Sequence, residues 1–213
     1  MAQGPLSYNN AQNPSKVRVP ENLDAQGALL TAARHGACYE TAYLGNSYWG
    51  ANQTGVTTSA GLATTYVGLC LSNPAGSGKN LAIGKVSAYL TVAPAAVLGV
   101  GLIVGYSAAG VVTHTTALTV YSDLIGATAG AGANGTNVGT PVGLVDGACT
   151  IVGTPLWYQR LGVGLVSANL LSVWEDINGG IVLPPGAYLA IGTNVAGPTS
   201  GFWGSIQWEE NPQ

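Results

Sequence analysis

Apolar and polar residues alternate through residues 202–209, near the C-terminus. The positions fall into two sets, one apolar or small and one mostly polar: Phe202, Gly204, Ile206 and Trp208 against Trp203, Ser205, Gln207 and Glu209. A period of two places successive side chains on opposite faces of a β-strand, whereas a helix would need a period of 3.6. The pattern predicts a closing strand with one buried face. Trp203 falls on the other face, which makes it a candidate contact for another subunit.

Turn-forming residues divide the part of the chain before this strand into shorter pieces. Asn178, Gly179 and Gly180 tolerate positive φ, and Pro184 has no N–H to give to a β-ladder. We therefore expect further strands at residues 170–174, 181–183 and 187–193. The C-terminal fifth of the chain is thus predicted to be antiparallel β-structure.

Upstream, β-branched and apolar runs are separated by residues typical of turns. We expect strands at residues 37–44, 55–59, 64–72, 80–93, 97–106, 111–121, 149–152 and 157–166. Residues 45–50 are expected to form an aromatic turn, 73–79 a loop and 126–143 a long flexible loop. Many short strands without a sustained helical period predict an all-β fold, an antiparallel β-sandwich that is most simply a jelly roll.

One uncharged stretch, residues 86–106, is about long enough to cross a bilayer. Pro94 lies in its middle, and Gly99 and Gly101 weaken its second half as a helix. Its valine and threonine content favours strands. We therefore expect two buried strands joined near residues 93–96, and no membrane partner.

Residues 1–36 differ from the rest and predict an N-terminal arm in front of a β-sandwich domain at residues 37–213. Up to Pro20 the segment is polar and interrupted by prolines, which argues against a helix. Residues 24–35 allow either one short helix or an extended lead-in. The residues of the arm expected to contact a neighbouring subunit or capsid are Val17, Arg18, Val19 and Leu23.

Only 7% of the 213 residues are charged, against roughly a quarter in an ordinary globular domain. Few charges leave the surface of a monomer prone to self-association. The surface is either rich in uncharged polar residues or largely covered by partner subunits, and we favour the second interpretation. The net charge is −3 and the six Lys and Arg residues are scattered. No basic stripe is available to neutralise phosphates, so we expect no nucleic-acid partner.

Residues able to carry catalysis are few. His35 and His114 lack a second ligand at HxH or HxxxH spacing, and no GxSxG motif is present. His114 lies in an alternating run and is expected to face outward or to hydrogen-bond to a neighbour. Cys38, Cys70 and Cys149 lie far apart and are expected to be core residues. We therefore predict no catalytic residues, no cofactor and no metal, and no enzyme activity.

Two carboxylate doublets come closest to a catalytic pair, Glu175-Asp176 and Glu209-Glu210. Two carboxylates about 5–10 Å apart could hydrolyse a glycoside. Adjacent residues on a strand, however, point to opposite faces, so neither doublet pairs with itself. We expect these residues to be solvated charges in a loop and near the terminus.

Two segments carry a resemblance to a known family: GVTTSAGLATTYVGLCLSNPAGSGKNLAI at residues 55–83 and GGIVLPPGAYLAIGTN at residues 179–194. Together with the proline-marked arm, they resemble structural proteins of tailed-bacteriophage virions, in particular head decoration or cement proteins with a jelly-roll fold. Over residues 37–210 the resemblance is one of general sequence character rather than of a single motif. It implies a homotrimer on the outer surface of the capsid, with the major capsid protein as its partner, and it brings no catalytic motif.

The resemblance implies that the protein belongs to the virion. The first residues lack the basic and apolar regions of a secretory signal, which agrees with synthesis in the host cytoplasm. The alternative is a phage adhesin or fibre-tip domain that recognises host glycans through loops at residues 45–55 and 126–143. Trp49 would then be a contact residue. A glycosidase that uses Glu175 or Glu209 is a third interpretation.

Overall fold

The chain separates into two units, Met1–Gly36 and Ala37–Gln213. The computed structural model describes only residues of the second unit: 38–108, 112–124, 141–151, 153–164 and 171–213. The expected contacts of the arm, Val17, Arg18, Val19 and Leu23, lie outside the described residues.

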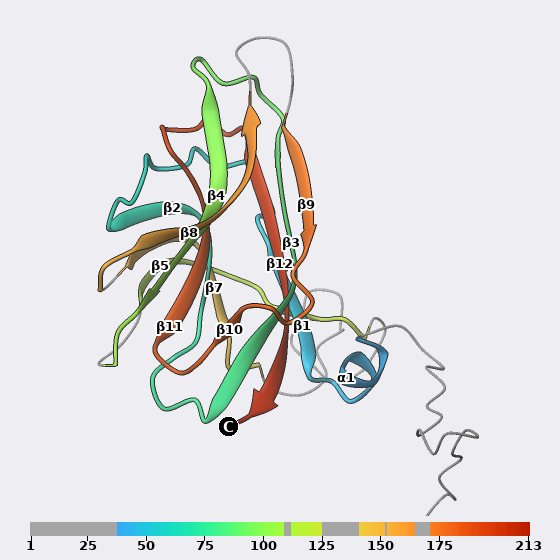
Figure 1. The fold of residues 1–213 in the computed structure, drawn as a ribbon. Helices are drawn as coiled ribbons and strands as arrows, with labels where there is room; N and C mark the ends of the chain where they lie inside the picture. The colour runs from blue at the N-terminus through green and yellow to red at the C-terminus, as the bar shows by residue number, and fades with distance from the viewer. Residues whose placement is uncertain (1–37, 109–111, 125–140, 152, 165–170) are drawn as a thin grey trace, which may run out of the picture. The chain divides into compact units, whose positions relative to one another are not determined.

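The described residues form one short helix and twelve strands. The elements in chain order are α1 (Tyr39–Tyr43), β1 (Ser47–Ala51), β2 (Thr65–Ser72), β3 (Lys79–Leu90), β4 (Leu98–Tyr106), β5 (Val112–Leu118), β6 (Tyr121–Ser122), β7 (Leu144–Ile151), β8 (Leu156–Gly164), β9 (Ser172–Asp176), β10 (Val182–Leu183), β11 (Ala187–Thr193) and β12 (Phe202–Pro212). The all-β prediction is confirmed, and the strands form two antiparallel sheets that pack against each other (Figure 1).

Each sheet contains six strands. In sheet one the order is β10-β3-β12-β1-β6, and β9 also pairs with β3. In sheet two the order is β5-β7-β2-β11-β4-β8. Four of the pairs are nested: β1 with β12, β2 with β11, β3 with β9, and β4 with β8. The four pairs therefore resemble successive parts of one long β-hairpin. They belong alternately to sheet one and sheet two.

The main core lies between the sheets and confirms the alternation seen in the sequence. The first set of β12 residues, Phe202, Gly204, Ile206 and Trp208, is buried, and the second set is only partly buried. Tyr48 of β1 packs beside Trp208, with ring centroids 6.1 Å apart. Removing a buried aromatic side chain of this size costs about 3–5 kcal/mol, so these rings are central to stability.

Sheet two is curled. β7 and β8 lie four strand positions apart, which is about 19 Å in a flat sheet. Ile151 and Leu156, which end and begin these strands, are five residues apart and can span only about 17 Å. The curl encloses a second core on the side of the sheet away from sheet one: Tyr66, Cys70, Ile103, Cys149, Ile151, Tyr188 and Ala190.

Three expectations near the start of the domain are wrong. Residues 55–59, expected as a strand, form only an isolated bridge from Val56 to Phe202. The segment at residues 37–44, also expected as a strand, contains helix α1, Tyr39–Tyr43, whose turn is closed by hydrogen bonds such as Leu44 N–H to the carbonyl of Glu40. The expected aromatic turn at residues 45–50 is largely strand β1, which lies between β12 and β6. Burial of Tyr48 in the core outweighs the turn signal of the glycines on either side.

The uncharged stretch at residues 86–106 does form two strands. β3 ends at Leu90 and β4 begins at Leu98. Among the described residues, no helix combines the length and apolar character needed to cross a membrane.

Candidate functional site

Strand β8 leaves one edge of sheet two open, since β8 is the terminal strand among the described residues. Its large apolar side chains are exposed: Leu156, Trp157, Tyr158 and Val163. Half of the Leu156 surface and 54% of the Tyr158 surface are accessible. Proteins usually protect such an edge with charges, prolines or a covering element, because its free N–H and C=O groups can pair with another chain.

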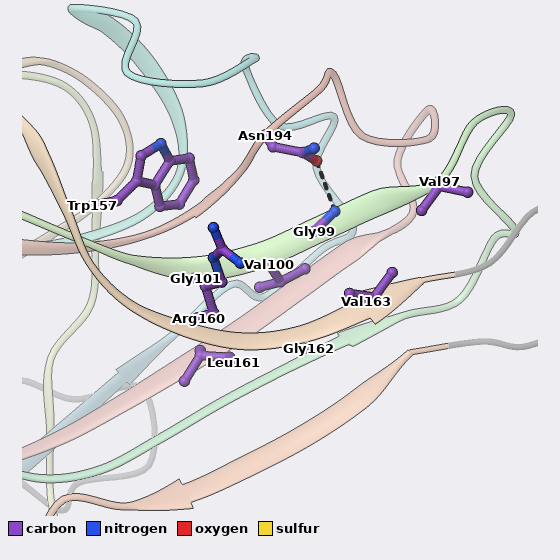
Figure 2. Close-up of a pocket in the computed structure, with 10 residues that line it drawn as sticks. All are labelled: Val97, Gly99, Val100, Gly101, Trp157, Arg160, Leu161, Gly162, Val163 and Asn194. Atoms are coloured by element: carbon purple, nitrogen blue, oxygen red, sulfur yellow. Dashed lines mark hydrogen bonds between the residues drawn. The ribbon is translucent and has the colours of Figure 1, made fainter.

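A groove of about 600 Å³ lies beside this edge, on β4 and β8 (Figure 2). We call it the edge groove; its lining includes Val97, Gly99, Trp157, Arg160, Val163 and Asn194. The Gly99 N–H donates a hydrogen bond to Oδ1 of Asn194 at 2.7 Å, which holds the loop after β11 against β4. Arg160 forms no ion pair within the described part of the chain.

Glycines make room for Trp157 in this groove. A Cβ atom at Gly101 would lie 3.2 Å from the Trp157 ring and 2.5 Å from the carbonyl oxygen of Gln159. At Gly192 a Cβ atom would lie 3.6 Å from the ring and 2.3 Å from Ile103. The indole therefore lies close to the backbone of sheet two at Gly101, where a Cβ atom would crowd both the ring and the neighbouring strand.

The outer face of sheet one carries a second groove, of about 440 Å³. We call it the transverse groove; its lining includes Trp49, Ser87, Tyr89, Trp174, Ser205 and Gln207. Cross-strand pairs place Trp174 beside Ser87 and Ser87 beside Ser205, so a row of side chains runs across β9, β3 and β12. The groove follows this row.

Trp203 lies on the outer face of sheet one, as the alternation predicts. Its ring stacks on Tyr89 of β3, with centroids 5.8 Å apart and planes 10° apart. This contact within the chain explains why Trp203 is half-buried. Its role as a contact between subunits stays a prediction.

His114 on β5 and Asp146 on β7 form a polar pair at the other edge of sheet two. His114 Nδ1 lies 2.6 Å from Oδ2 of Asp146, which confirms that His114 hydrogen-bonds to a neighbour. Asp146 is buried, and its Oδ1 has no hydrogen-bond partner among the described residues. Burial raises the pKa of the Asp146 carboxyl, and the hydrogen bond to His114 lowers it in part.

The cysteines behave mostly as predicted. Cys70 and Cys149 are buried in the second core, and Cys38 is only partly buried. A hydrogen bond with Cys149 and burial hold the pKa of the Cys70 thiol well above its usual range. Protonated thiols of this kind are poor nucleophiles.

The expectation that Glu210 is a solvated charge is wrong. Its carboxylate is buried and accepts hydrogen bonds from the N–H groups of Val142 and Gly143 at 2.8 and 2.9 Å. Lys79 forms an ion pair with it at 2.9 Å. Glu210 thus fastens the end of β12 to the start of β3 and to the segment before β7.

The other carboxylates are not brought into a catalytic arrangement. Glu175 and Asp176 are exposed on β9, and Glu209 accepts a hydrogen bond from Thr41 at 2.8 Å. No group of three or more His, Cys, Asp or Glu residues is placed to hold a metal ion within the described ranges. Of the two loops expected to recognise glycans, the one at residues 45–55 contains strand β1, and most of the one at residues 126–143 lies outside those ranges.

Comparison of the chain with protein-family models, curated proteins and solved structures finds no significant match. The functional proposals below start from the geometry of the two grooves and of the β8 edge.

Proposed function

We propose that the protein is a virion structural protein, which binds the outer surface of a phage capsid as a homotrimer and stabilises the shell. The observation that carries this proposal is the open apolar edge at β8. Leu156, Trp157 and Tyr158 are consecutive exposed apolar residues at the start of this terminal strand. Covering such an edge with another protein chain removes apolar surface from water and satisfies backbone groups.

The strand order supports a jelly-roll assignment. With β1, β2, β3, β4, β8, β9, β11 and β12 counted as eight strands, sheet one reads 1-8-3-6 and sheet two reads 2-7-4-5. This order matches that of two interlocked Greek keys, the pattern expected of a jelly roll. Strands β5, β6 and β7 are then an insertion that widens both sheets.

In a cyclic trimer each subunit offers two different surfaces, one to each neighbour. The β8 edge and the edge groove supply one of them in this proposal. The arm at residues 1–36 reaches the major capsid protein, since about 30 extended residues can span on the order of 100 Å. A protein that binds only the assembled shell shifts the equilibrium away from dissociation by mass action.

The proposal is tested by adding the full-length protein, or residues 37–213, to capsids of its own virion that lack it. All described strands lie within residues 37–213, so we expect the shorter chain to keep its fold. The full-length protein should co-sediment with capsids and raise their temperature of disruption. The shorter chain should lose both effects.

Two results would contradict the proposal. One is a full-length protein that does not bind capsids. The other is a bound protein that leaves the resistance of the capsids to heat and pressure unchanged.

A further inference from the structure

We propose that the transverse groove is a binding site for a neutral carbohydrate. Its floor is made of small hydroxyl side chains, Ser87 and Ser205, whose oxygens lie 2.7 Å apart. Because each hydroxyl has one proton and two lone pairs, this pair keeps one O–H donor and several acceptor positions for a ligand. The volume of about 440 Å³ lies within the range of small-molecule sites.

Aromatic rings surround this polar floor. On one side Tyr89 stacks with Trp203, and on the other Trp49 stacks with Tyr121 at a centroid distance of 4.8 Å. Trp174 stands at the β9 end with 69% of its surface exposed. The C–H groups on the flat side of a pyranose ring carry slight positive charge and pack on the electron-rich face of such rings.

Contacts with neighbouring side chains restrict the position of the Trp174 ring although the ring is exposed. The Lys85 ammonium lies 5.4 Å from the centre of its ring and 3.7 Å from a carboxylate oxygen of Asp176. A cation over an indole face is favourable even at exposed sites. This contact presents the indole as a partly ordered platform at the end of the groove, which reduces the entropy cost of binding.

The charges in the groove favour an uncharged ligand. Lys85 is paired with Asp176, and the Asp123 carboxylate accepts hydrogen bonds from Gln207 at 2.7 Å and from Ser47. Among the described residues, the groove therefore offers a phosphate or sulfate no cation that lacks a carboxylate partner. It does offer fixed amide, hydroxyl and carboxylate oxygens, which suit the hydroxyl groups of a sugar.

The same chemistry argues against a protein partner in this groove. The buried centre of a protein–protein interface is more apolar than the surrounding surface and depleted of charge. Here the lining includes the polar Ser87, Ser205 and Gln207 together with the charged Lys85 and Asp123. This inference does not rest on capsid binding.

The test uses the full-length protein in native gels that contain a neutral polysaccharide (galactomannan, xyloglucan or glycogen) and in an array of neutral and acidic oligosaccharides. We expect at least one neutral glycan to retard the protein. Trp174→Ala should weaken that binding about tenfold, the loss expected for one stacking ring. Ser87→Leu, which fills the floor, should abolish it.

The matched control is Tyr106→Ala, which removes an exposed aromatic ring at the end of β4 in the other sheet and should leave glycan binding unchanged. Melting curves of all three variants verify that they are folded. Absence of binding to every neutral glycan, or binding to acidic glycans alone, would overturn the proposal. So would binding that survives both Trp174→Ala and Ser87→Leu, or an oligomer that dissociates with Trp174→Ala, because the groove would then be a subunit contact.

Discussion

Sheet two ends in two edge strands that differ in chemistry. β5 exposes Thr113, His114, Thr115 and Thr116, whereas β8 exposes Leu156, Trp157, Tyr158 and Val163. Both edges are unpaired within the described residues. Polar side chains on an edge strand remain hydrated, whereas an exposed apolar edge strand tends to pair with another chain.

The two edges also differ in what holds them to the sheet. β5 is anchored to β7 by the pair of His114 with the buried Asp146. β8 is anchored to β4 by close packing of Trp157 over Gly101. We infer that the β5 edge faces solvent, whereas the β8 edge contacts another protein chain.

The largest expected effect comes from placing a charge on one edge or the other. Tyr158→Lys on β8 should raise the dissociation constant of the oligomer about a hundredfold, as loss of a central contact does. Thr115→Lys on β5 adds the same charge and should leave it unchanged. Sedimentation over a range of protein concentrations measures both constants, and equal effects at the two edges would remove the distinction between them.

Gly101→Ala tests whether glycine packing holds β8 in place. Its Cβ atom would lie 2.5 Å from the carbonyl oxygen of Gln159, so β8 must move. We expect the free energy of unfolding to fall by about 2–3 kcal/mol in urea titrations. The control is Gly99→Ala, two residues away, whose Cβ atom would come no closer than 3.6 Å to Asn194. Similar losses for the two variants would contradict this explanation.

His114→Ala tests the polar anchor of β5. It leaves the buried carboxylate of Asp146 without its described hydrogen-bond partner. The free energy of unfolding should fall by about 1–2 kcal/mol, while the mass of the oligomer stays the same. Thr113→Ala on the same exposed strand should have little effect. A change of oligomer mass in His114→Ala would show that the β5 edge also contacts a partner.

The smallest effect is a pH dependence. The pKa of Asp146 is raised in the folded protein, so between its usual value and the raised value the folded state binds more protons than the unfolded state. The stability of the wild type relative to Asp146→Asn should therefore fall as pH rises through that window. Unfolding titrations of both proteins from acid to neutral pH measure the difference. A difference that grows with pH would contradict the raised pKa.

Several features of the fold could be predicted because local chemistry decides them. The loop after β2 was predicted from its Asn, Pro and Gly residues, and there the Asn73 side chain donates to the carbonyl oxygens of Lys79 and Leu183 at 2.8 Å. The two faces of β12 followed from the alternation alone. Both signals depend on neighbours in the sequence.

Other features depend on contacts between distant residues. Gly50 suggested a turn, but it allows β1 to pack closely on sheet two, since its Cβ atom would lie 2.7 Å from Val145. The transverse groove depends on the register that sets Ser205 beside Ser87 and Ser87 beside Trp174. The outward set on β12 was visible in the sequence, but its partners on other strands were not.

The measurement that tests the central claim most directly is the mass of the full-length protein in solution, determined by sedimentation equilibrium over a range of concentrations. The chain has a mass of 21.4 kDa. If the β8 edge is completed by another copy, the mass should be three times that value at micromolar concentration. A monomer at every concentration would contradict the claim that this edge joins subunits.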